Sequence, residues 1–318
     1  MAIFAFYSVK GGTSRTTLTA NLGAMLARQG YRVGLVDADI EGSGLDIFLA
    51  TAAGRNLRVE GIVCLAERLQ QRYAKELTGT LVDVLLAEKV REDGTYWIPA
   101  SELLSSGTAP HEQPELGPDG DLWLLPCGRE WCKLARLRYT DKTAEALRQL
   151  LELMQKKLSL DHILVDCRSG VADSALVAAL AADCLLMTVI PSNAHLLGAW
   201  DAVEIVEKTA LGAPWCVKTQ VIHYVASKVP PDKTTVQAIQ GFFSNIRFHP
   251  SGLSFVPFHN GMTAAECIPG INGDQHPDDK AYAAALRSLW RDLEMRLASL
   301  PKHLLATTKG IRAILSQD

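Results

Sequence analysis

The chain has 318 residues, of which 48% are hydrophobic and 21% charged, with a formal net charge of −3. This length suits one large α/β domain with an insertion, or two smaller domains, and the composition is that of a globular protein with enough material for a core. The small net charge excludes a globally basic protein that binds nucleic acid or anionic lipid, so any such contact would need a local patch.

Short apolar runs alternate with longer segments of helical spacing. Several runs are apolar almost throughout, as strands covered on both faces are. The predicted strands are 2–9, 31–39, 121–128, 162–170, 183–192, 218–227 and 253–259. The predicted helices are 16–29, about 133–158, 173–182, 195–211, 234–245 and 280–300. This order predicts an α/β fold with a doubly wound, mostly parallel sheet flanked by helices.

Two segments depart from this alternation. Residues 55–104 suggest one or two inserted helices, and residues 105–120 are rich in proline, glycine and charge, as a long loop is. We therefore predict a single domain over 1–300 with an insertion at about 55–120, followed by a C-terminal tail, 301–318. The tail is short, weakly basic and ends in an aspartate, which favours docking on protein over membrane targeting.

A glycine-rich turn, "KGGTSRTT" (10–17), joins the first predicted strand to the first predicted helix. Gly11 and Gly12 let backbone N–H groups turn toward an anion, and the positive end of the following helix points at the same spot. Thr16 offers a hydroxyl that suits the coordination shell of a magnesium ion. The strand, turn, hydroxyl and helix together favour a phosphate-binding loop over a plain structural turn.

The turn resembles the deviant Walker A motif of the ParA/MinD superfamily, KGGxGK[ST][ST], and within it a branch with arginine at the second lysine, KGGxGR[ST]. Two further segments strengthen the resemblance. "VDADIEGSGLDIFL" (36–49) is similar to D-x-D-[LI]-E-x-x-G-L, and "ILVDCRSGVADSA" (163–175) is similar to D-x-R-[TS]-G. "PSNAHLLGAWDAV" (191–203) follows at the expected distance. The resemblance covers most of the sheet, omits 55–120 and thins out after residue 218.

The resemblance implies a P-loop ATPase that binds ATP and Mg²⁺ and forms a homodimer when ATP is bound. Lys10 matches the signature lysine, which reaches the nucleotide of a second subunit. Asp39 matches the switch carboxylate that positions water, and Asp166 matches a carboxylate that holds magnesium through water. Lys10, Arg15 and Asp39 are therefore the predicted catalytic residues, and Thr16, Asp39 and Asp166 the predicted magnesium ligands. The predicted nucleotide-binding residues lie in the loop or near strand ends: Lys10, Gly11, Gly12, Thr13, Ser14, Arg15, Thr16, Thr17, Arg168 and Pro257.

Two residues depart from the family motif. Arg15 keeps the charge of a lysine on a larger, forked group, so it can still bind phosphate oxygens. A shift of the γ-phosphate by about 1 Å would nevertheless cost on the order of a hundredfold in rate. Ser14 replaces a glycine, and the exchange is costly where φ is positive. Both slow hydrolysis and binding without turnover stay open. The alternative function is a non-hydrolysing scaffold or sensor that presents its insertion to a partner.

Several neighbouring residues allow two interpretations. Arg168 is a γ-phosphate sensor or a surface arginine paired with a residue such as Asp173. Glu41 is a second catalytic carboxylate or a polar switch residue, whereas Asp37 is interpreted as a structural hydrogen-bonder. The segment 221–229 lacks the asparagine with which the superfamily often recognises adenine. ATP is thus expected from the resemblance alone, with main-chain groups around Pro257 as candidates for contacting the base.

The remaining features favour packing or solvation over chemistry. The eight histidines have no metal-ligand spacing, and His195 and His249 are interpreted as structural or solvent-facing. The seven cysteines are scattered, and Cys127 and Cys132, five apart, have no matching Cys or His pair, which favours core packing over a zinc site. A basic cluster around 136–139 with Arg148 is the nearest approach to a DNA-binding patch, but it is interpreted as a solvated helix face. Without a signal peptide or an apolar span, we expect a soluble cytoplasmic protein with reduced thiols and an unidentified protein partner.

Overall fold

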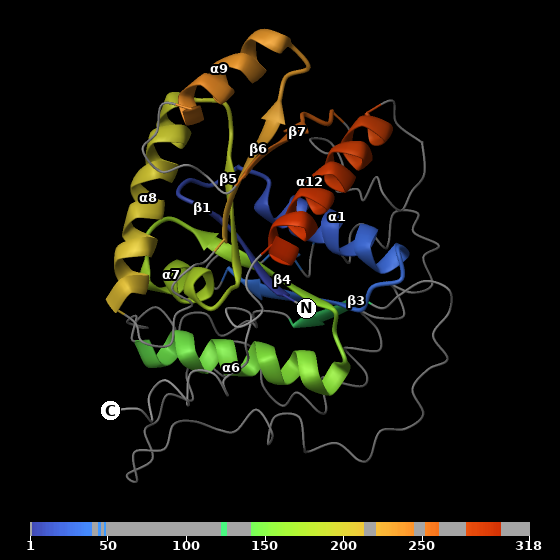
Figure 1. The fold of residues 1–318 in the computed structure, drawn as a ribbon, viewed down its shortest axis with the longest axis vertical. Helices are drawn as coiled ribbons and strands as arrows, with labels where there is room; N and C mark the ends of the chain where they lie inside the picture. Colours follow the sequence, from blue (N-terminus) through green and yellow to red (C-terminus); the bar gives the residue numbers. More distant parts are fainter. Residues whose placement is uncertain are drawn as a thin grey trace.

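A parallel sheet of seven strands forms the centre of the computed structural model, with helices on both faces (Figure 1). The structure describes residues 2–39, 44, 45, 48, 122–125, 141–212, 221–244, 252–260 and 278–299. The strand order is β3-β2-β4-β1-β5-β6-β7, and every pairing is parallel. The predicted doubly wound α/β fold is therefore confirmed. The predicted insertion at 55–120 and the tail at 301–318 lie outside the described residues.

Each predicted strand and helix outside the insertion at 55–120 has a counterpart in the structure. The strands are β1 Ala2–Ser8, β2 Val33–Ala38, β3 Leu122–Leu125, β4 His162–Ser169, β5 Cys184–Val189, β6 Val221–Val229 and β7 Gly252–Pro257. The helices are α1 Arg15–Arg28, α6 Asp141–Leu158, α7 Asp173–Leu180, α8 Asn193–Gly212, α9 Lys233–Ser244 and α12 Asp279–Ser299. The helix predicted from about residue 133 is described only from Asp141 onward.

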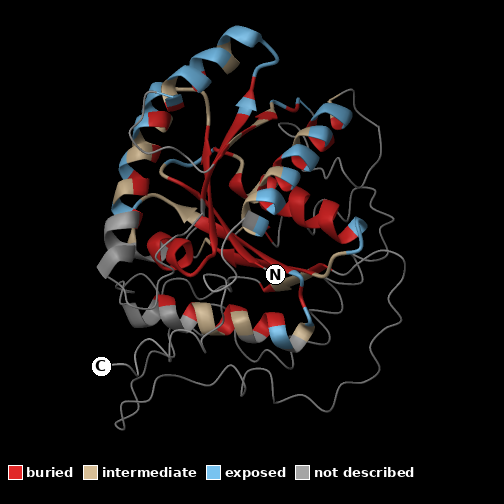
Figure 2. Cartoon of the chain, in the orientation of Figure 1, coloured by how far each residue is buried: buried red, intermediate tan, exposed pale blue. Residues whose placement is uncertain are grey.

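Two apolar cores lie on opposite faces of the sheet, because successive side chains of a strand point to opposite sides. From β1, Phe4 and Phe6 face the core beneath α1 and α12. Ile3, Ala5 and Tyr7 face the core beneath α6, α7, α8 and α9. Every residue of β1, β2 and β5 is buried, which explains why these strands are apolar almost throughout (Figure 2).

A polar network ties α6 to the sheet. Arg148 donates from Nη1 to Oδ1 of Asp183 at 2.7 Å and from Nε to Oε1 of Glu152 at 2.8 Å. Asp183 in turn accepts the backbone N–H of Ile3 through Oδ2 at 2.8 Å. These carboxylates hold the pKa of Arg148 above its ordinary value, although burial opposes the shift. Arg148 is thus engaged in structural ion pairs, which makes it a poor candidate for a phosphate contact with DNA.

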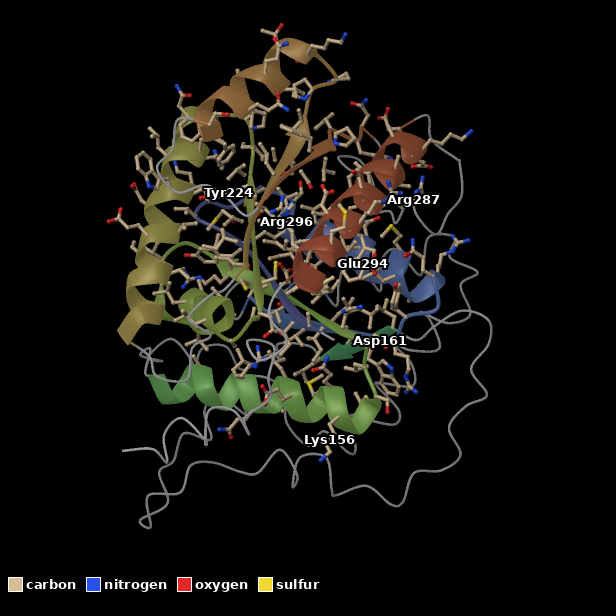
Figure 3. All side chains as sticks on the ribbon, in the orientation of Figure 1. Lys156, Asp161, Tyr224, Arg287, Glu294 and Arg296 are labelled. Carbon is tan, nitrogen blue, oxygen red and sulfur yellow. The ribbon has the colours of Figure 1, made fainter. Side chains whose placement is uncertain are left out.

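An aromatic cluster joins α12 to the amino end of the sheet. The ring of His162 lies 4.7 Å from that of Trp290 and 5.3 Å from that of Tyr31, centroid to centroid. Tyr31 donates its hydroxyl to Glu294 at 3.0 Å, and Glu294 is labelled on α12 in Figure 3. Burial lowers the pKa of His162 to about 4. His162 is therefore a neutral packing residue at pH 7, with no other role indicated by its contacts.

The order of the strands creates a crevice at the carboxyl edge of the sheet. β1 lies between β4 and β5, and the chain leaves β1 through α1 to reach β2 on the far side of β4. Such a reversal opens a space outside the carboxyl ends of the central strands, where ligands of doubly wound folds bind. The loop 9–14 and the carboxyl ends of β2 and β4 meet at this edge.

Candidate nucleotide-binding site

The loop between β1 and α1 contains two residues with left-handed backbone. Gly12 has φ of 78°, and Ser14, directly before α1, has φ of 63° and ψ of 25°. The carbonyl of Ser14 accepts the N–H of Leu18 at 2.8 Å, which starts the helix. Ser14 thus occupies the conformation for which a glycine would be preferred. Ser14 therefore has the positive φ at which a serine in place of a glycine is expected to cost stability.

Hydrogen bonds from β5 and β6 hold the loop in place. The hydroxyls of Thr13 and Thr188 lie 2.9 Å apart in a hydrogen bond, and the Thr188 hydroxyl lies 3.2 Å from the carbonyl of Tyr7. Ser227 donates its hydroxyl to the carbonyl of Thr13 at 2.8 Å. Thr13 was predicted to bind nucleotide; the residue as a whole is 1% exposed, and its hydroxyl is bonded to Thr188 of β5. The hydroxyl of Thr13 therefore holds the loop against the sheet.

A cavity of about 400 Å³ extends from this loop to the ends of β6 and β7. Its lining is shared between the loop with the start of α1, the end of β6, the end of β7 and the first turn of α12. The residues are Gly12, Thr13, Ser14, Arg15, Thr16, Thr17, Leu18, Ser227, Lys228, Val256, Pro257, Phe258, His259 and Tyr282. Most predicted nucleotide-binding residues, including Pro257, therefore line one cavity; Lys10, Gly11 and Arg168 do not.

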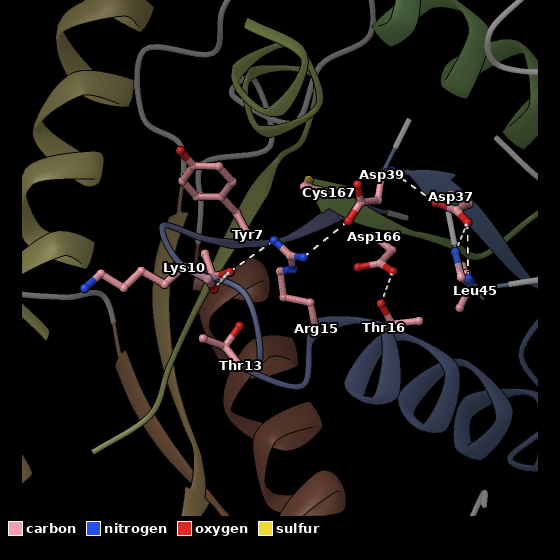
Figure 4. Close-up of polar contacts among 12 residues, drawn as sticks. Tyr7, Lys10, Thr13, Arg15, Thr16, Asp37, Asp39, Leu45, Asp166 and Cys167 are labelled. Atoms are coloured by element: carbon pink, nitrogen blue, oxygen red, sulfur yellow. Dashed lines mark hydrogen bonds and ion pairs between the residues drawn. The ribbon is translucent and has the colours of Figure 1, made fainter. Parts of the chain in front are cut away.

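Thr16 and Asp166 form a short hydrogen bond beside the loop. The Thr16 hydroxyl donates to Oδ2 of Asp166 at 2.6 Å (Figure 4). Burial raises the pKa of Asp166 to about 7, against the hydrogen bond from Thr16, which lowers it. Oδ1 of Asp166 is buried and has no hydrogen-bond partner within the described part of the chain. Asp166 thus carries buried oxygen-ligand capacity that a cation would satisfy.

These oxygen groups fit Mg²⁺, which takes hydroxyl and carboxylate ligands and retains several waters. Asp39, the third predicted ligand, directly follows β2 and pairs with Arg15, and Figure 4 shows it on the same side of Arg15 as Asp166. A metal site made largely of side chains would need more protein ligands than these. Within the described ranges, no group of three or more His, Cys, Asp or Glu side chains could hold a metal. A magnesium ion here would complete its shell with water and phosphate oxygens.

Arg15 reaches across the loop to two partners. Its Nη1 donates to the hydroxyl of Ser8 at 3.1 Å, and its Nη2 pairs with Oδ2 of Asp39 at 3.4 Å. The side chain is 9% exposed, yet Arg15 lines the cavity. The predicted phosphate arginine and the predicted switch carboxylate are therefore brought into direct contact.

The two remaining predicted cations lie elsewhere. Lys10 is exposed, and Figure 4 shows its side chain pointing away from Arg15. Its main-chain carbonyl accepts the hydroxyl of Ser8 at 2.8 Å. Arg168 is half-buried near the end of β4. The side chain of Lys10 is thus exposed and is not part of the cavity lining.

Asp37 organises the chain that follows β2. Its carboxylate accepts the N–H of Asp39 at 3.0 Å and those of Gly44 and Leu45 at 3.2 Å each. Asp37 is fully buried, so these backbone bonds compensate its desolvation. The interpretation of Asp37 as a structural hydrogen-bonder is confirmed. Glu41 lies outside the described residues.

Sequence reasoning missed the residues that hold the loop from other strands. Ser8, Thr188 and Ser227 are buried hydroxyls inside apolar runs, and nothing local marks their partners. The only available signal was that a polar residue within a strand covered on both faces needs a hydrogen-bond partner. Lys228 was also missed: it lines the cavity and has φ of 55°, which is uncommon for a residue other than glycine.

His195, predicted to be structural or solvent-facing, lies in the first turn of α8. Its Nδ1 is 2.8 Å from the hydroxyl of Ser192, and the ring is half-buried. Burial and then the charge of Lys10 lower its pKa, whereas the backbone of Gly11 raises it. Gly198 of α8 approaches Val9 closely, so the start of α8 packs beside the loop, and a neutral, structural histidine accounts for the contacts.

A glycine-containing loop between a central strand and a helix, with a hydroxyl–carboxylate pair at the sheet's carboxyl edge, defines the class of P-loop nucleotide-binding proteins. Residues 4–266 match the family model described as the CobQ/CobB/MinD/ParA nucleotide binding domain. Because that match covers more than half of the chain, the protein belongs to this family. The resemblance inferred from the loop motif is thereby confirmed at the level of the family.

Individual relatives agree with this assignment. An uncharacterized ATP-binding protein of Methanocaldococcus jannaschii is 27% identical over 243 residues, which span 76% of this chain and 70% of the relative. MinD from Pyrococcus horikoshii, solved with Mg-ADP, is similar with a TM-score of 0.56 and 18% identity, covering 92% of this chain and 98% of that one. The MinC:MinD cell division complex of Aquifex aeolicus gives 0.57 and 19%, covering 92% and 96%. At these identities the two structures show a shared fold.

Among the helices of the described residues, none is both long and apolar enough to cross a membrane bilayer. The two described cysteines, Cys167 and Cys184, are buried and free.

Proposed function

We propose that the protein binds ATP with Mg²⁺, hydrolyses it slowly, and uses the bound nucleotide to control association with a second copy of itself. Through this switch it would regulate or position a protein partner. The observation that carries the proposal is the cavity lined by residues 12–18, which are the end of the loop and the start of α1, with the Thr16–Asp166 and Arg15–Asp39 contacts beside it. Phosphoryl transfer requires mainly positioning and charge neutralisation, which these groups can provide.

Each part of the site has a role in this proposal. Backbone N–H groups of the loop and the start of α1 would bind the phosphates, and Arg15 would supply a positive charge next to them. Thr16 and Asp166 would hold Mg²⁺, which neutralises phosphate charge when it is bound. Asp39 would orient the attacking water. The far wall of the cavity, with Pro257 and Phe258, is the proposed place for the base.

The family supports the choice of nucleotide and of the switch. The Methanocaldococcus relative is named as an ATP-binding protein, MinD of Pyrococcus horikoshii was solved with Mg-ADP, and the Aquifex structure holds MinD with its partner MinC. The outward orientation of Lys10 supports a contact with a second molecule (Figure 4). These findings favour a nucleotide-controlled assembly over a nucleotide bound only for structure.

The test is the molar mass of the protein with nucleotide, measured by light scattering. With Mg-ATP we expect a mass of twice the 34.6 kDa of the chain, and with Mg-ADP the mass of one chain. Lys10→Ala should bind Mg-ATP and keep the mass of one chain. Lys156→Ala, which removes an exposed lysine of α6 (Figure 3), is the matched control and should behave as the wild type.

Two results would count against the proposal. A mass that is the same with ATP and ADP, in protein shown by calorimetry to bind both, would leave the alternative of a non-hydrolysing scaffold or sensor. An equal loss of the dimer in Lys10→Ala and Lys156→Ala would mean that Lys10 has no specific part in the contact.

A further inference from the structure

The guanidinium of Arg15 is held by two partners of different character. Nη1 lies 3.1 Å from the Ser8 hydroxyl, and Nη2 lies 3.4 Å from Oδ2 of Asp39. Charged N–H···O bonds are commonly about 2.7–2.9 Å long, so the contact with Asp39 is a loose one. Arg15 also lines the cavity, which places the same group between the carboxylate and the space for a phosphate.

The Ser8 side of this contact is fixed. Ser8 is fully buried in β1, and its hydroxyl donates to the carbonyl of Lys10 at 2.8 Å while accepting from Arg15. The Asp39 side is more open, because Asp39 directly follows β2 and its side chain is 15% exposed. Nη1 of Arg15 thus bonds to a buried residue of the sheet, whereas Nη2 pairs with a carboxylate that is partly exposed to water.

We propose that a nucleotide phosphate replaces Asp39 at Nη2 of Arg15, so that the arrival of phosphate releases the carboxylate from the arginine. This inference rests on the proposed function and adds a means of regulation to the same site. A nucleotide phosphate group carries more negative charge than a carboxylate, and the arginine fork suits its oxygens. The arm on Ser8 keeps the guanidinium in place during the exchange. A lysine side chain has a single nitrogen, so it could not hold Ser8 with one nitrogen while a second exchanges Asp39 for phosphate.

The consequence is competition between Asp39 and the nucleotide. The apparent affinity is reduced by the fraction of protein in which Asp39 occupies Arg15, so removal of the carboxylate charge should tighten binding. The probe is AMPPNP, a non-hydrolysable ATP analogue, titrated by calorimetry in EDTA, so that any role of Asp39 toward magnesium does not enter. For Asp39→Asn we expect a dissociation constant about fivefold lower than that of the wild type.

Two further variants separate the exchange from a general effect of charge. Asp201→Asn removes an exposed carboxylate of α8 and should leave the dissociation constant unchanged. In an Arg15→Gln background, titrated at concentrations high enough to measure AMPPNP binding, Asp39→Asn should have no effect on the dissociation constant. Unchanged or weaker binding by Asp39→Asn would overturn the inference, and so would equal tightening with and without Arg15. A wild type that binds neither AMPPNP nor ADP would instead contradict the proposed function.

Discussion

Ser14 adopts the left-handed conformation at the start of α1, with φ of 63°. For a residue with a Cβ this conformation costs roughly 1–2 kcal/mol. Ser14→Gly should therefore raise the free energy of unfolding, by up to about 1 kcal/mol after the added freedom of the unfolded chain is subtracted. Urea denaturation of the ligand-free protein measures this change.

The matched control is the same substitution where the backbone is helical. Ser288 is an exposed residue within α12, and Ser288→Gly should lower the free energy of unfolding by about 0.5–1 kcal/mol. If Ser14→Gly destabilised the protein as much as Ser288→Gly, the serine at position 14 would be under no backbone strain.

At the scale of elements, α6 is joined to the sheet by a charge pair that is mostly shielded from water. Arg148 and Asp183 lie 2.7 Å apart, with side chains 22% and 9% exposed. Arg148→Met keeps the aliphatic packing but leaves the carboxylate of Asp183 without its counter-charge. The free energy of unfolding should fall by about 2–3 kcal/mol, as measured in urea.

Glu152→Gln provides the control, because it removes the charge that pairs with Arg148 within the same helix and leaves the Arg148–Asp183 pair in place. That contact joins residues four apart, and Glu152 is 25% exposed, so the loss should stay below about 1 kcal/mol. Equal losses in the two variants would show that the link from α6 to Asp183 contributes nothing special.

The elements themselves were largely predictable from the sequence. β1, β4 and β5 are buried on both faces, and this produces the nearly continuous apolar runs from which they were predicted. The positions of Gly12 and Thr16 between β1 and α1 were predictable as well, because a glycine-rich turn that joins a strand to a helix has a recognisable local pattern.

Contacts between distant segments could not be predicted from local sequence patterns. Thr188 and Ser227 meet Thr13 across 175 and 214 positions of the chain, and their register is set by strand pairing that no local pattern encodes. The Arg15–Asp39 pair depends in the same way on the order β2-β4-β1. The motif predicted Thr13 as a nucleotide-binding residue, but it gave no information on the hydrogen bond between the Thr13 and Thr188 hydroxyls.

For the whole molecule, His162 makes stability depend on pH. Its pKa is lowered by burial to about 4, below its ordinary value of 6.5. Between pH 6.5 and 4 the unfolded chain binds a proton that the folded chain does not, so stability is full above pH 6.5 and falls as the pH decreases. At pH 5 this costs about 2 kcal/mol. His162→Phe, which suits the aromatic cluster, should flatten the decrease of the thermal midpoint from pH 7 to pH 5.

A neighbouring variant controls for the packing of the same cluster. Tyr31→Phe changes a ring that lies 5.3 Å from His162 but leaves the titrating imidazole, so its midpoint should fall with pH as steeply as in the wild type. A midpoint in His162→Phe that is just as sensitive to pH would assign the acid lability to other groups.

The central claim is that this site turns over ATP, and phosphate release from saturating Mg-ATP tests it most directly. The wild type and Asp39→Ala would be compared after calorimetry has established that both bind the nucleotide. The account predicts slow turnover in the wild type and none in the variant, because Asp39 is the group proposed to orient the attacking water. Absence of turnover in a wild type that binds Mg-ATP, or equal turnover in the two proteins, would contradict it.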